Sequence, residues 1–248
     1  MFPKISIIIP TFNSKETLPA CLDSCISQTY SSLEIIIIDN ESTDGTLTII
    51  KKYQSIHSFI HYISEKDNGI YDAMNKGIDI AKGDFLLFLG SDDRLYNSEV
   101  LNNIFNKSKL FEKHDVIYGN VSLNGTEDIY GGKFTSYRLL HWNICHQAIF
   151  TRKEVFNKLN KFETQYKIYA DYAFNMKWFN NKTIKHNYIN ITVSMFSQGG
   201  YSYNNIDCAF DKDKSLLQKK FFPFLIVFLY RNKSKIVIKQ LVHLIYGY

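Results

Sequence analysis

Four apolar runs near the start of the chain constrain its fold more than any other feature. The runs are residues 4–10 (KISIIIP), 33–39 (LEIIIID), 59–65 (FIHYISE) and 84–90 (DFLLFLG). A short run that is apolar on both sides and rich in β-branched residues is typical of a strand in a parallel sheet covered on both faces. We therefore expect these runs to be buried strands of such a sheet.

Helical patterns separate these runs. Thr17 is placed to cap a helix with Pro19 in its first turn, and Asp44 is placed to cap the segment GTLTIIKKY. Residues 69–83 carry apolar side chains at helical spacing and end in Gly83, a residue type that favours a helix C-terminus. This alternation of strands and helices predicts an open, doubly wound α/β sheet.

Acidic residues follow three of the four runs. Asp39 ends the second run, Asp67 follows the third, and Asp92 and Asp93 come just after the fourth. In open α/β sheets, ligands bind in the crevice beyond the carboxyl ends of the strands. We expect these carboxylates to share one rim, where a divalent cation and bound hydroxyl groups would relieve their mutual repulsion.

The bulk composition is that of a globular protein. The chain has 248 residues, of which 45% are hydrophobic, enough to bury a sizeable core as one large domain or as one domain with an appendage. Its four cysteines show no metal-ligand spacing, and we assign them no chemistry. The first apolar stretch is short, is stopped by Pro10 and lacks a cleavage site, so we expect a cytoplasmic protein.

Several ordered segments resemble the family 2 glycosyltransferases of GT-A fold, especially bacterial enzymes that build O-antigen and other surface polysaccharides. The segments are SIIIPTFNSKETLPACLDSCISQTY, EIIIIDNESTDGT, SEKDNGIYDAMNKGIDIAKGDFLLFLGSDD and ADYAF. The resemblance implies a Rossmann-like, open mixed sheet flanked by helices. It also implies a GT-A domain at 1–205, with a nucleotide-binding half at 1–95 and an acceptor-binding half at 96–205, followed by a helical, basic segment at 206–248.

The resemblance implies roles for individual residues. Asp39 would accept a hydrogen bond from the uracil imide, Asp92 would contact the ribose, and Asp93 would bind Mn²⁺ or Mg²⁺ at the two phosphates. Asp171 matches the catalytic base of inverting members, and His146 would touch the acceptor or the metal. The other implied nucleotide-sugar-binding residues are Pro10, Thr11, Asn13, Lys66, Asp67, Asn75 and Lys76.

Independently of the resemblance, the chemistry of inverting sugar transfer from a nucleoside diphosphate gives roles to a bound cation and to a carboxylate base. Departure of a nucleoside diphosphate leaves negative charge on the pyrophosphate, which an oxygen-bound cation stabilises. A carboxylate that removes the proton of the incoming hydroxyl makes it a nucleophile, and its attack from the opposite face inverts the anomeric carbon. Together with this chemistry, the resemblance implies an inverting transferase that moves a sugar from a UDP-sugar to a hydroxyl of an undecaprenyl-pyrophosphate-linked glycan in surface polysaccharide synthesis.

Two positions depart from the family pattern. Gly90 stands where the family often has the first acid of Asp-x-Asp, and Ala170 stands where a Glu often precedes the base. These departures leave open a sugar-nucleotide-binding or scaffold protein without transfer activity. A sugar nucleotidyltransferase is a weaker alternative, because the PTFNSKET segment after the first strand lacks the glycine-rich phosphate loop of that class.

Some single features have a structural interpretation beside the functional one. Asp39 and Asp44 could serve a turn and a helix cap, and His146 could be a hydrogen-bonded interior histidine. Residues 198–202 (QGGYS) could close over the donor as a flexible loop or form an ordinary turn.

The basic charge of the chain is concentrated at its C-terminal end. Residues 212–248 hold eight basic residues and one acidic residue, which leaves the rest slightly acidic despite a net charge of +5. The segment FFPFLIVFLY is too short to span a bilayer and contains Pro223, while RNKSKIVIKQLVHLIYGY mixes basic and apolar residues. This tail is expected either to lie on the inner, anionic face of the cytoplasmic membrane or to pack on the domain. Nucleic acid is not an expected partner, since no nucleic-acid-binding motif is present.

Overall fold

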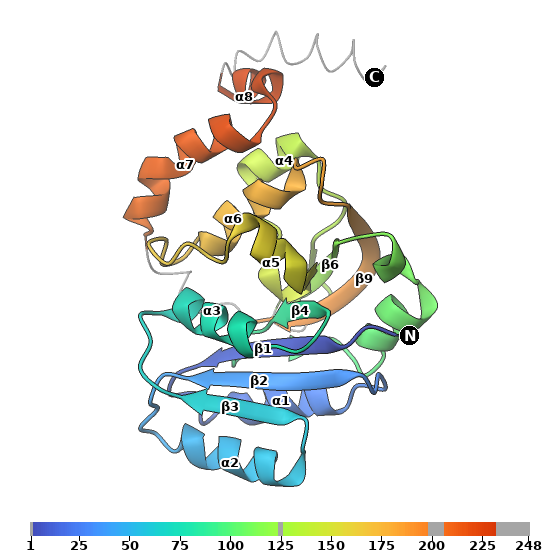
Figure 1. Ribbon diagram of the computed structural model, residues 1–248, viewed down its shortest axis with the longest axis vertical. Helices are drawn as coiled ribbons and strands as arrows, with labels where there is room; N and C mark the ends of the chain where they lie inside the picture. The colour runs from blue at the N-terminus through green and yellow to red at the C-terminus, as the bar shows by residue number, and fades with distance from the viewer. Residues whose placement is uncertain (1, 124–125, 198–205, 232–248) are drawn as a thin grey trace.

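One mixed sheet organises the part of the chain that the computed structural model describes, residues 2–123, 126–197 and 206–231 (Figure 1). Its strands are β1 (Ile5–Thr11), β2 (Leu33–Asp39), β3 (Ile60–Ser64), β4 (Phe85–Phe88), β5 (Arg94–Leu95), β6 (Val116–Leu123), β7 (Ile129–Tyr130), β8 (Ile149–Arg152) and β9 (His186–Phe196). The order across the sheet is β3-β2-β1-β4-β8-β6-β9-β5, and β7 pairs with β6.

Helices cover both faces of this sheet (Figure 1). They are α1 (Leu18–Ile26), α2 (Thr46–Ile56), α3 (Ile70–Ile80), α4 (Ser136–His141), α5 (Lys153–Leu159), α6 (Ala170–Phe179), α7 (Cys208–Phe221) and α8 (Phe224–Arg231). Shorter helical turns lie at Asn102–Lys107, Leu110–Glu112 and His146–Ala148.

The first four strands are parallel, as the apolar runs predict. β1 pairs in parallel with both β2 and β4, and β2 pairs in parallel with β3. The register sets Thr11 opposite Asp39 and Asp39 opposite Ser64. The carboxyl ends of these strands therefore meet at one edge of the sheet, where ligands of such folds bind.

The second half of the sheet is mixed. β8 runs antiparallel to β4 and to β6, whereas β9 runs parallel to β6 and antiparallel to β5. The open mixed sheet that the family resemblance implies is thus confirmed.

Alternate residues of each buried strand enter opposite layers of the core. Ile8 and Leu86 pack with α3 on one face, while Ile7 and Leu87 pack with α1 on the other. This alternation follows from the two-residue period of a strand. It explains why the runs are apolar at every position rather than at every second one.

The two predicted helix caps differ from expectation in detail. Thr17 occupies the N-cap position of α1, but its side chain makes no capping hydrogen bond. Instead, the Ser14 carbonyl accepts the Leu18 N–H at 2.9 Å. Asp44 lies one residue before the N-cap of α2, and its carboxylate accepts the Thr46 N–H at 3.0 Å.

The C-terminal helices α7 and α8 pack against α6 and α4 rather than standing apart. Phe210 and Leu217 of α7 belong to the same buried cluster as Trp178 of α6. No helix among the described residues is long and apolar enough to cross a membrane. Residues 198–202 and residues 232–248 of the basic tail lie outside the described part of the chain, and the boundary at residue 205 stays a prediction.

Gly77 allows α3 to lie directly on β1. A Cβ at this position would come within 2.4 Å of Ile8 Cγ2. We therefore expect Gly77→Ala to lower the free energy of unfolding by about 1–3 kcal/mol, measured by urea titration, although alanine favours a helix. The Ile8→Ala background is the control: the added methyl should cost less there, and an equal cost in both backgrounds would contradict this contact.

Candidate active site

Asp39 ends β2 as a fully buried carboxylate. Its two oxygens accept the Ser42 hydroxyl at 2.5 Å and the Ser64 hydroxyl at 2.6 Å, and Oδ2 also accepts the Ser42 N–H at 3.2 Å. Asp39 therefore ties the loop after β2 to the end of β3. It lies at the predicted edge of the sheet.

The loop after β1 is held against the loop after β2. Pro10 and Thr11 are buried at the end of β1. Asn13 has φ of 48°, a left-handed conformation that Asn tolerates. Its side-chain oxygen accepts the Thr43 N–H at 2.9 Å, and its N–H donates to the Ser42 hydroxyl at 2.8 Å. These contacts shape the edge at which a nucleotide is expected.

The segment before α3 is held by local polar contacts. The Asp67 N–H donates to the Asn40 side chain at 2.8 Å, and the Asp67 carboxylate accepts the Gly69 N–H at 2.8 Å. Burial raises the pKa of Asp67 above its ordinary value. Lys76 donates to the Lys66 carbonyl at 2.7 Å and pairs with Glu65 at 2.8 Å. Its ammonium group therefore holds the segment before α3 against this helix.

Asn75 faces a different partner. Its side-chain amide donates to the Phe162 carbonyl at 2.9 Å and accepts the Phe162 N–H at 3.0 Å. These paired bonds join α3 to the segment that leads toward α6. The structure therefore places Asn75 away from the candidate cavity, as a link between two elements.

A cavity of about 210 Å³ opens beyond the carboxyl end of β4. It is lined by Ile70, Tyr71, Gly90, Asp92, Asp93, Asn143, Cys145, His146, Gln147, Lys167, Ile168, Tyr169, Asp171, Phe196 and Ser197. Four of the predicted site residues, Asp92, Asp93, His146 and Asp171, are in this set. Pro10, Thr11, Asn13, Asp39, Lys66, Asp67, Asn75 and Lys76 are not.

Asp93 is the most constrained carboxylate of the cavity, with 2% of its surface exposed. One oxygen accepts the Gln147 amide at 3.0 Å and the Gly90 N–H at 2.9 Å, and the other accepts the Ser197 N–H at 3.2 Å. Burial raises the pKa of Asp93 to about 6, and repulsion from Asp92 adds to this shift. The side chain is held in place while its charge remains poorly compensated.

Asp171 lies in the first turn of α6 and is also buried. Oδ1 accepts the Tyr172 N–H at 2.8 Å and lies 2.9 Å from the Tyr71 hydroxyl, whose one proton can point to Oδ1 or to the Ile168 carbonyl. Oδ2 accepts the Asn143 amide at 2.8 Å and lies 3.3 Å from His146 Nδ1. Donors from several elements therefore orient this carboxylate, and no neighbouring Glu is needed for that purpose.

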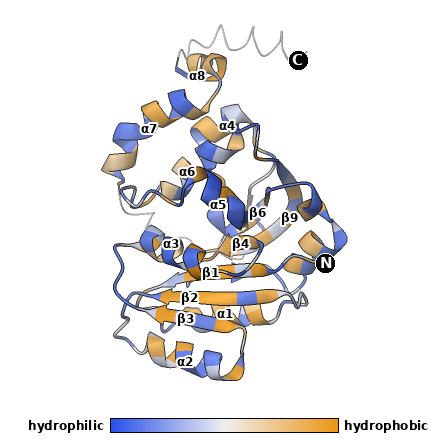
Figure 2. Cartoon of the chain, viewed as in Figure 1, coloured by the Kyte–Doolittle hydropathy of each residue, from blue (hydrophilic) through white to orange (hydrophobic). Residues whose placement is uncertain are grey.

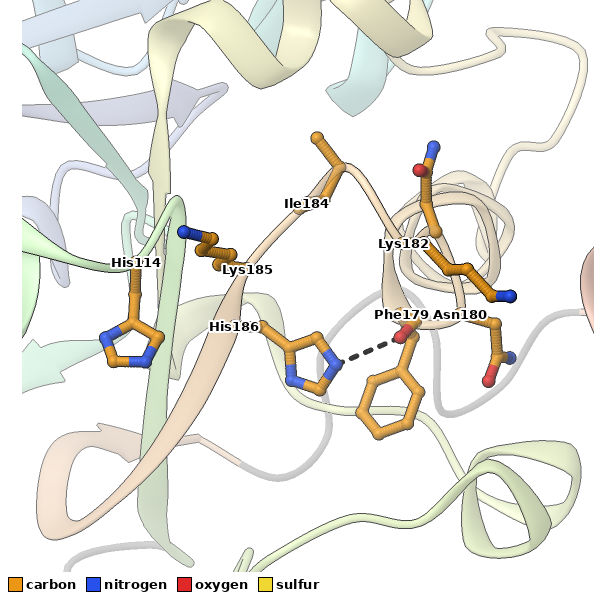
Figure 3. Close-up of a pocket in the computed structure, with 8 residues that line it drawn as sticks. His114, Phe179, Asn180, Lys182, Ile184, Lys185 and His186 are labelled. Atoms are coloured by element: carbon orange, nitrogen blue, oxygen red, sulfur yellow. Dashed lines mark hydrogen bonds between the residues drawn. The ribbon is translucent and has the colours of Figure 1, made fainter.

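A second hollow of the surface has no carboxylate among its lining residues (Figure 3). It is lined by His114, Phe179, Asn180, Asn181, Lys182, Ile184, Lys185 and His186. His186 Nε2 donates to the Phe179 carbonyl at 2.9 Å, and burial lowers the pKa of this imidazole. We interpret His186 as a neutral structural residue, and we place the site in the cavity of Asp93 and Asp171.

The family follows from the sequence match. The model of glycosyl transferase family 2 matches residues 6–186, which include both Asp93 and Asp171. The chain belongs to this family. A PGL/p-HBAD biosynthesis glycosyltransferase of Mycobacterium bovis is 36% identical over 243 residues, covering 97% of this chain and 94% of that protein. Family and relative together support glycosyltransferase activity.

Solved structures of other transferases share the fold. Residues 1–349 of S. aureus TarS in complex with UDP-GlcNAc match with a TM-score of 0.68 and 21% identity, over 86% of this chain and 65% of that one. The mannosyltransferase PcManGT of Pyrobaculum calidifontis, in complex with GDP-Man and Mn²⁺, matches with a TM-score of 0.65 and 18% identity, over 82% and 59%. This chain spans less than two thirds of either structure. At these identities the likeness shows the fold alone.

The carboxylates of this family 2 glycosyltransferase are compatible with a metal ion that takes most of its ligands from the substrate. In residues 2–123, 126–197 and 206–231, no three or more His, Cys, Asp or Glu side chains gather to hold an ion. Mg²⁺ in phosphate-binding sites commonly takes only one or two protein carboxylates together with substrate oxygens. Asp93 fits this requirement, because a cation would relieve the repulsion and desolvation that raise its pKa.

Several cavity residues escaped the sequence analysis. Tyr71 lies within the predicted helical segment 69–83 and has no predicted role, yet its hydroxyl contacts Asp171. Asn143 and Gln147 flank His146 and contact Asp171 and Asp93 respectively. Their nearness to His146 in HWNICHQAIF was the one available signal.

The raised pKa of Asp93 makes a stability prediction. Its pKa of about 6 in the folded protein exceeds the ordinary 3.8, so its negative charge opposes folding above pH 6 and this penalty vanishes as the pH falls below the ordinary value. In EDTA at about pH 7.5, Asp93→Asn should raise the free energy of unfolding by roughly 1–3 kcal/mol. The gain should shrink toward about pH 4. The exposed Asp211→Asn is the control, and a gain independent of pH would contradict the assignment.

Proposed function

We propose that this family 2 glycosyltransferase transfers a sugar from a UDP-sugar to a hydroxyl group with inversion of the anomeric carbon. The observation that carries the proposal is the single cavity lined by both Asp93 and Asp171. Asp93 would hold a cation at the departing diphosphate, and Asp171 would take the proton of the entering hydroxyl. An in-line displacement needs these two functions within reach of one anomeric carbon.

Asp171 is the proposed general base. Its orientation by Tyr71, Asn143 and His146 supports this role, because a base must meet the substrate hydroxyl in a fixed geometry. With His146 Nδ1 turned to Asp171, the other ring nitrogen is the one that can meet the acceptor. We therefore assign His146 to the acceptor rather than to a metal.

Asp93 is the proposed protein ligand of Mn²⁺ or Mg²⁺, with Asp92 at the ribose. When bound, the cation neutralises charge that develops on the departing diphosphate. Gln147, Gly90 and Ser197 hold the Asp93 carboxylate in position for this task.

The nucleotide is proposed to bind along the edge formed by the ends of β1, β2 and β3. Asp39 would read the uracil imide once the Ser42 hydroxyl turns away from it. Pro10, Thr11, Asn13, Lys66 and Asp67 surround this edge. TarS, which shares the fold, binds UDP-GlcNAc, and this supports UDP as the nucleotide.

The proposed acceptor is a sugar linked to undecaprenyl pyrophosphate, presented at the inner face of the cytoplasmic membrane. α8 supports a membrane contact, because Phe224 is 82% exposed and Leu225 is 54% exposed. This helix lies at one extremity of the molecule and is mostly apolar (Figure 2). Lys219 and Arg231 line an apolar groove with Phe224, which suits a surface that is both anionic and hydrophobic.

Two variants test the assignment of the carboxylates. Asp171→Asn should lower UDP release by about 10²–10⁴-fold while Mn²⁺-dependent UDP binding is kept. Asp93→Ala should lose the Mn²⁺ dependence of UDP binding. Turnover is measured with UDP-glucose, UDP-galactose and UDP-GlcNAc, with undecaprenyl-pyrophosphate-linked N-acetylglucosamine as acceptor. If Asp171→Asn keeps full turnover, or if the wild type binds UDP without turnover of any donor, the proposal fails.

Vesicle sedimentation tests the membrane contact. The wild type should sediment with phosphatidylglycerol vesicles and not with phosphatidylcholine vesicles. The pair Phe224→Ser and Leu225→Ser should weaken this binding by at least about tenfold, because each side chain buries apolar area in the bilayer. Ile56→Ser, at a 65% exposed position on α2, is the matched control. Equal sedimentation of all variants, or self-association without vesicles, would count against a membrane surface.

A further inference from the structure

Asp207 is a buried carboxylate to which the proposed reaction assigns no task. Only 3% of its surface is exposed, and it lies at the N-cap of α7. Oδ1 accepts the Phe210 N–H at 3.1 Å, which is an ordinary helix cap. Oδ2 makes a second set of contacts, with the Ile168 N–H at 2.8 Å and the Tyr169 N–H at 3.1 Å. A cap alone does not require this second set.

The peptide group between Ile168 and Tyr169 is held at both of its ends. Its N–H, on Tyr169, donates to Asp207. Its carbonyl, on Ile168, accepts the Tyr71 hydroxyl at 2.5 Å. Hydrogen bonds at the two ends of one peptide polarise each other, so the Asp207 charge strengthens this carbonyl as an acceptor.

The Tyr71 hydroxyl has one proton and two acceptors within reach. Besides the Ile168 carbonyl, the Asp171 carboxylate lies 2.9 Å from Tyr71 Oη. While the proton points to Ile168, the Tyr71 oxygen can accept a hydrogen bond from a protonated Asp171. Once the peptide moves, the proton has only Asp171 to bind, and this bond makes the carboxylate a weaker base.

We propose that Asp207 is a positioning residue that acts on Asp171 through the 168–169 peptide and the Tyr71 hydroxyl. By fixing the Ile168 carbonyl, it keeps an alternative acceptor for the Tyr71 proton. Asp171 is then able to take up the proton of the acceptor hydroxyl. This inference rests on the proposed function, because it takes Asp171 as the base.

Several titratable groups surround this chain of contacts. Titratable groups that face Asp171 are Tyr71, Tyr172, Cys145, His146 and, across the cavity, Asp93. Around Asp207, the Phe210 ring packs against Tyr166, Tyr169 and Tyr172. These ring contacts do not involve the Asp207 carboxylate, so we expect them to hold α7 in place when that carboxylate is removed.

The decisive variant is Asp207→Ser, since serine can still cap α7 but is too short to reach the 168–169 peptide as well. It should lower kcat by about tenfold or more with donor KM unchanged. Asp211→Ser, at an exposed position in the same turn of α7, should leave kcat unchanged. Unfolding by urea checks that both variants are folded.

A double-mutant cycle separates positioning from a general structural effect. If Asp207 acts through the Tyr71 proton, Asp207→Ser should have no further effect on kcat in the Tyr71→Phe background. Losses that multiply would overturn the proposal. A turnover-independent readout is amide hydrogen exchange at Tyr169, which should be slow in the wild type and at least about tenfold faster in Asp207→Ser. Equal exchange in the two proteins would also overturn it, whereas full turnover of Asp171→Asn would reject the base itself.

Discussion

Burial of the β1–β4 sheet on both faces is the constraint on which the rest of this structure depends. Because alternate side chains of Ile7 and Ile8 enter opposite core layers, the strands are fixed in register and direction. The four parallel strands then end at one edge of the sheet, so the polar residues that follow them lie along that edge. The close fit of Gly77 on Ile8 is part of the same constraint.

The two carboxylates Asp93 and Asp171 line one cavity but have different electrostatic surroundings. Asp93 is desolvated beside Asp92, so its pKa rises and a cation is the partner that would compensate it. Asp171 is surrounded by donors on both oxygens, which fixes its direction. These surroundings support the proposed roles of Asp93 as a metal ligand and of Asp171 as a base, because neighbouring dipoles and charges set the properties of a carboxylate.

The sequence predicted the first half of the fold, and the structure confirms it. Uniform apolar runs specify strands covered on both faces, and Asp92, Asp93 and Asp171 do line one cavity. The sequence did not indicate that the Asn75 amide bonds to Phe162, or that the Thr17 side chain makes no capping hydrogen bond. Both side chains respond to neighbours from other segments or to a single local dihedral angle, which periodicity does not report.

The local order of apolar and polar residues by itself determined which segments became strands and helices and which acids ended the strands. Only the tertiary structure decided the partners of those acids. Gln147 reaches Asp93 across 54 positions, Asn143 reaches Asp171 across 28, and Tyr71 reaches Asp171 across 100. Hydrophobic periodicity is a property of neighbours along the chain, whereas these hydrogen bonds depend on how β4, α3 and α6 are brought together by the packing of the whole core.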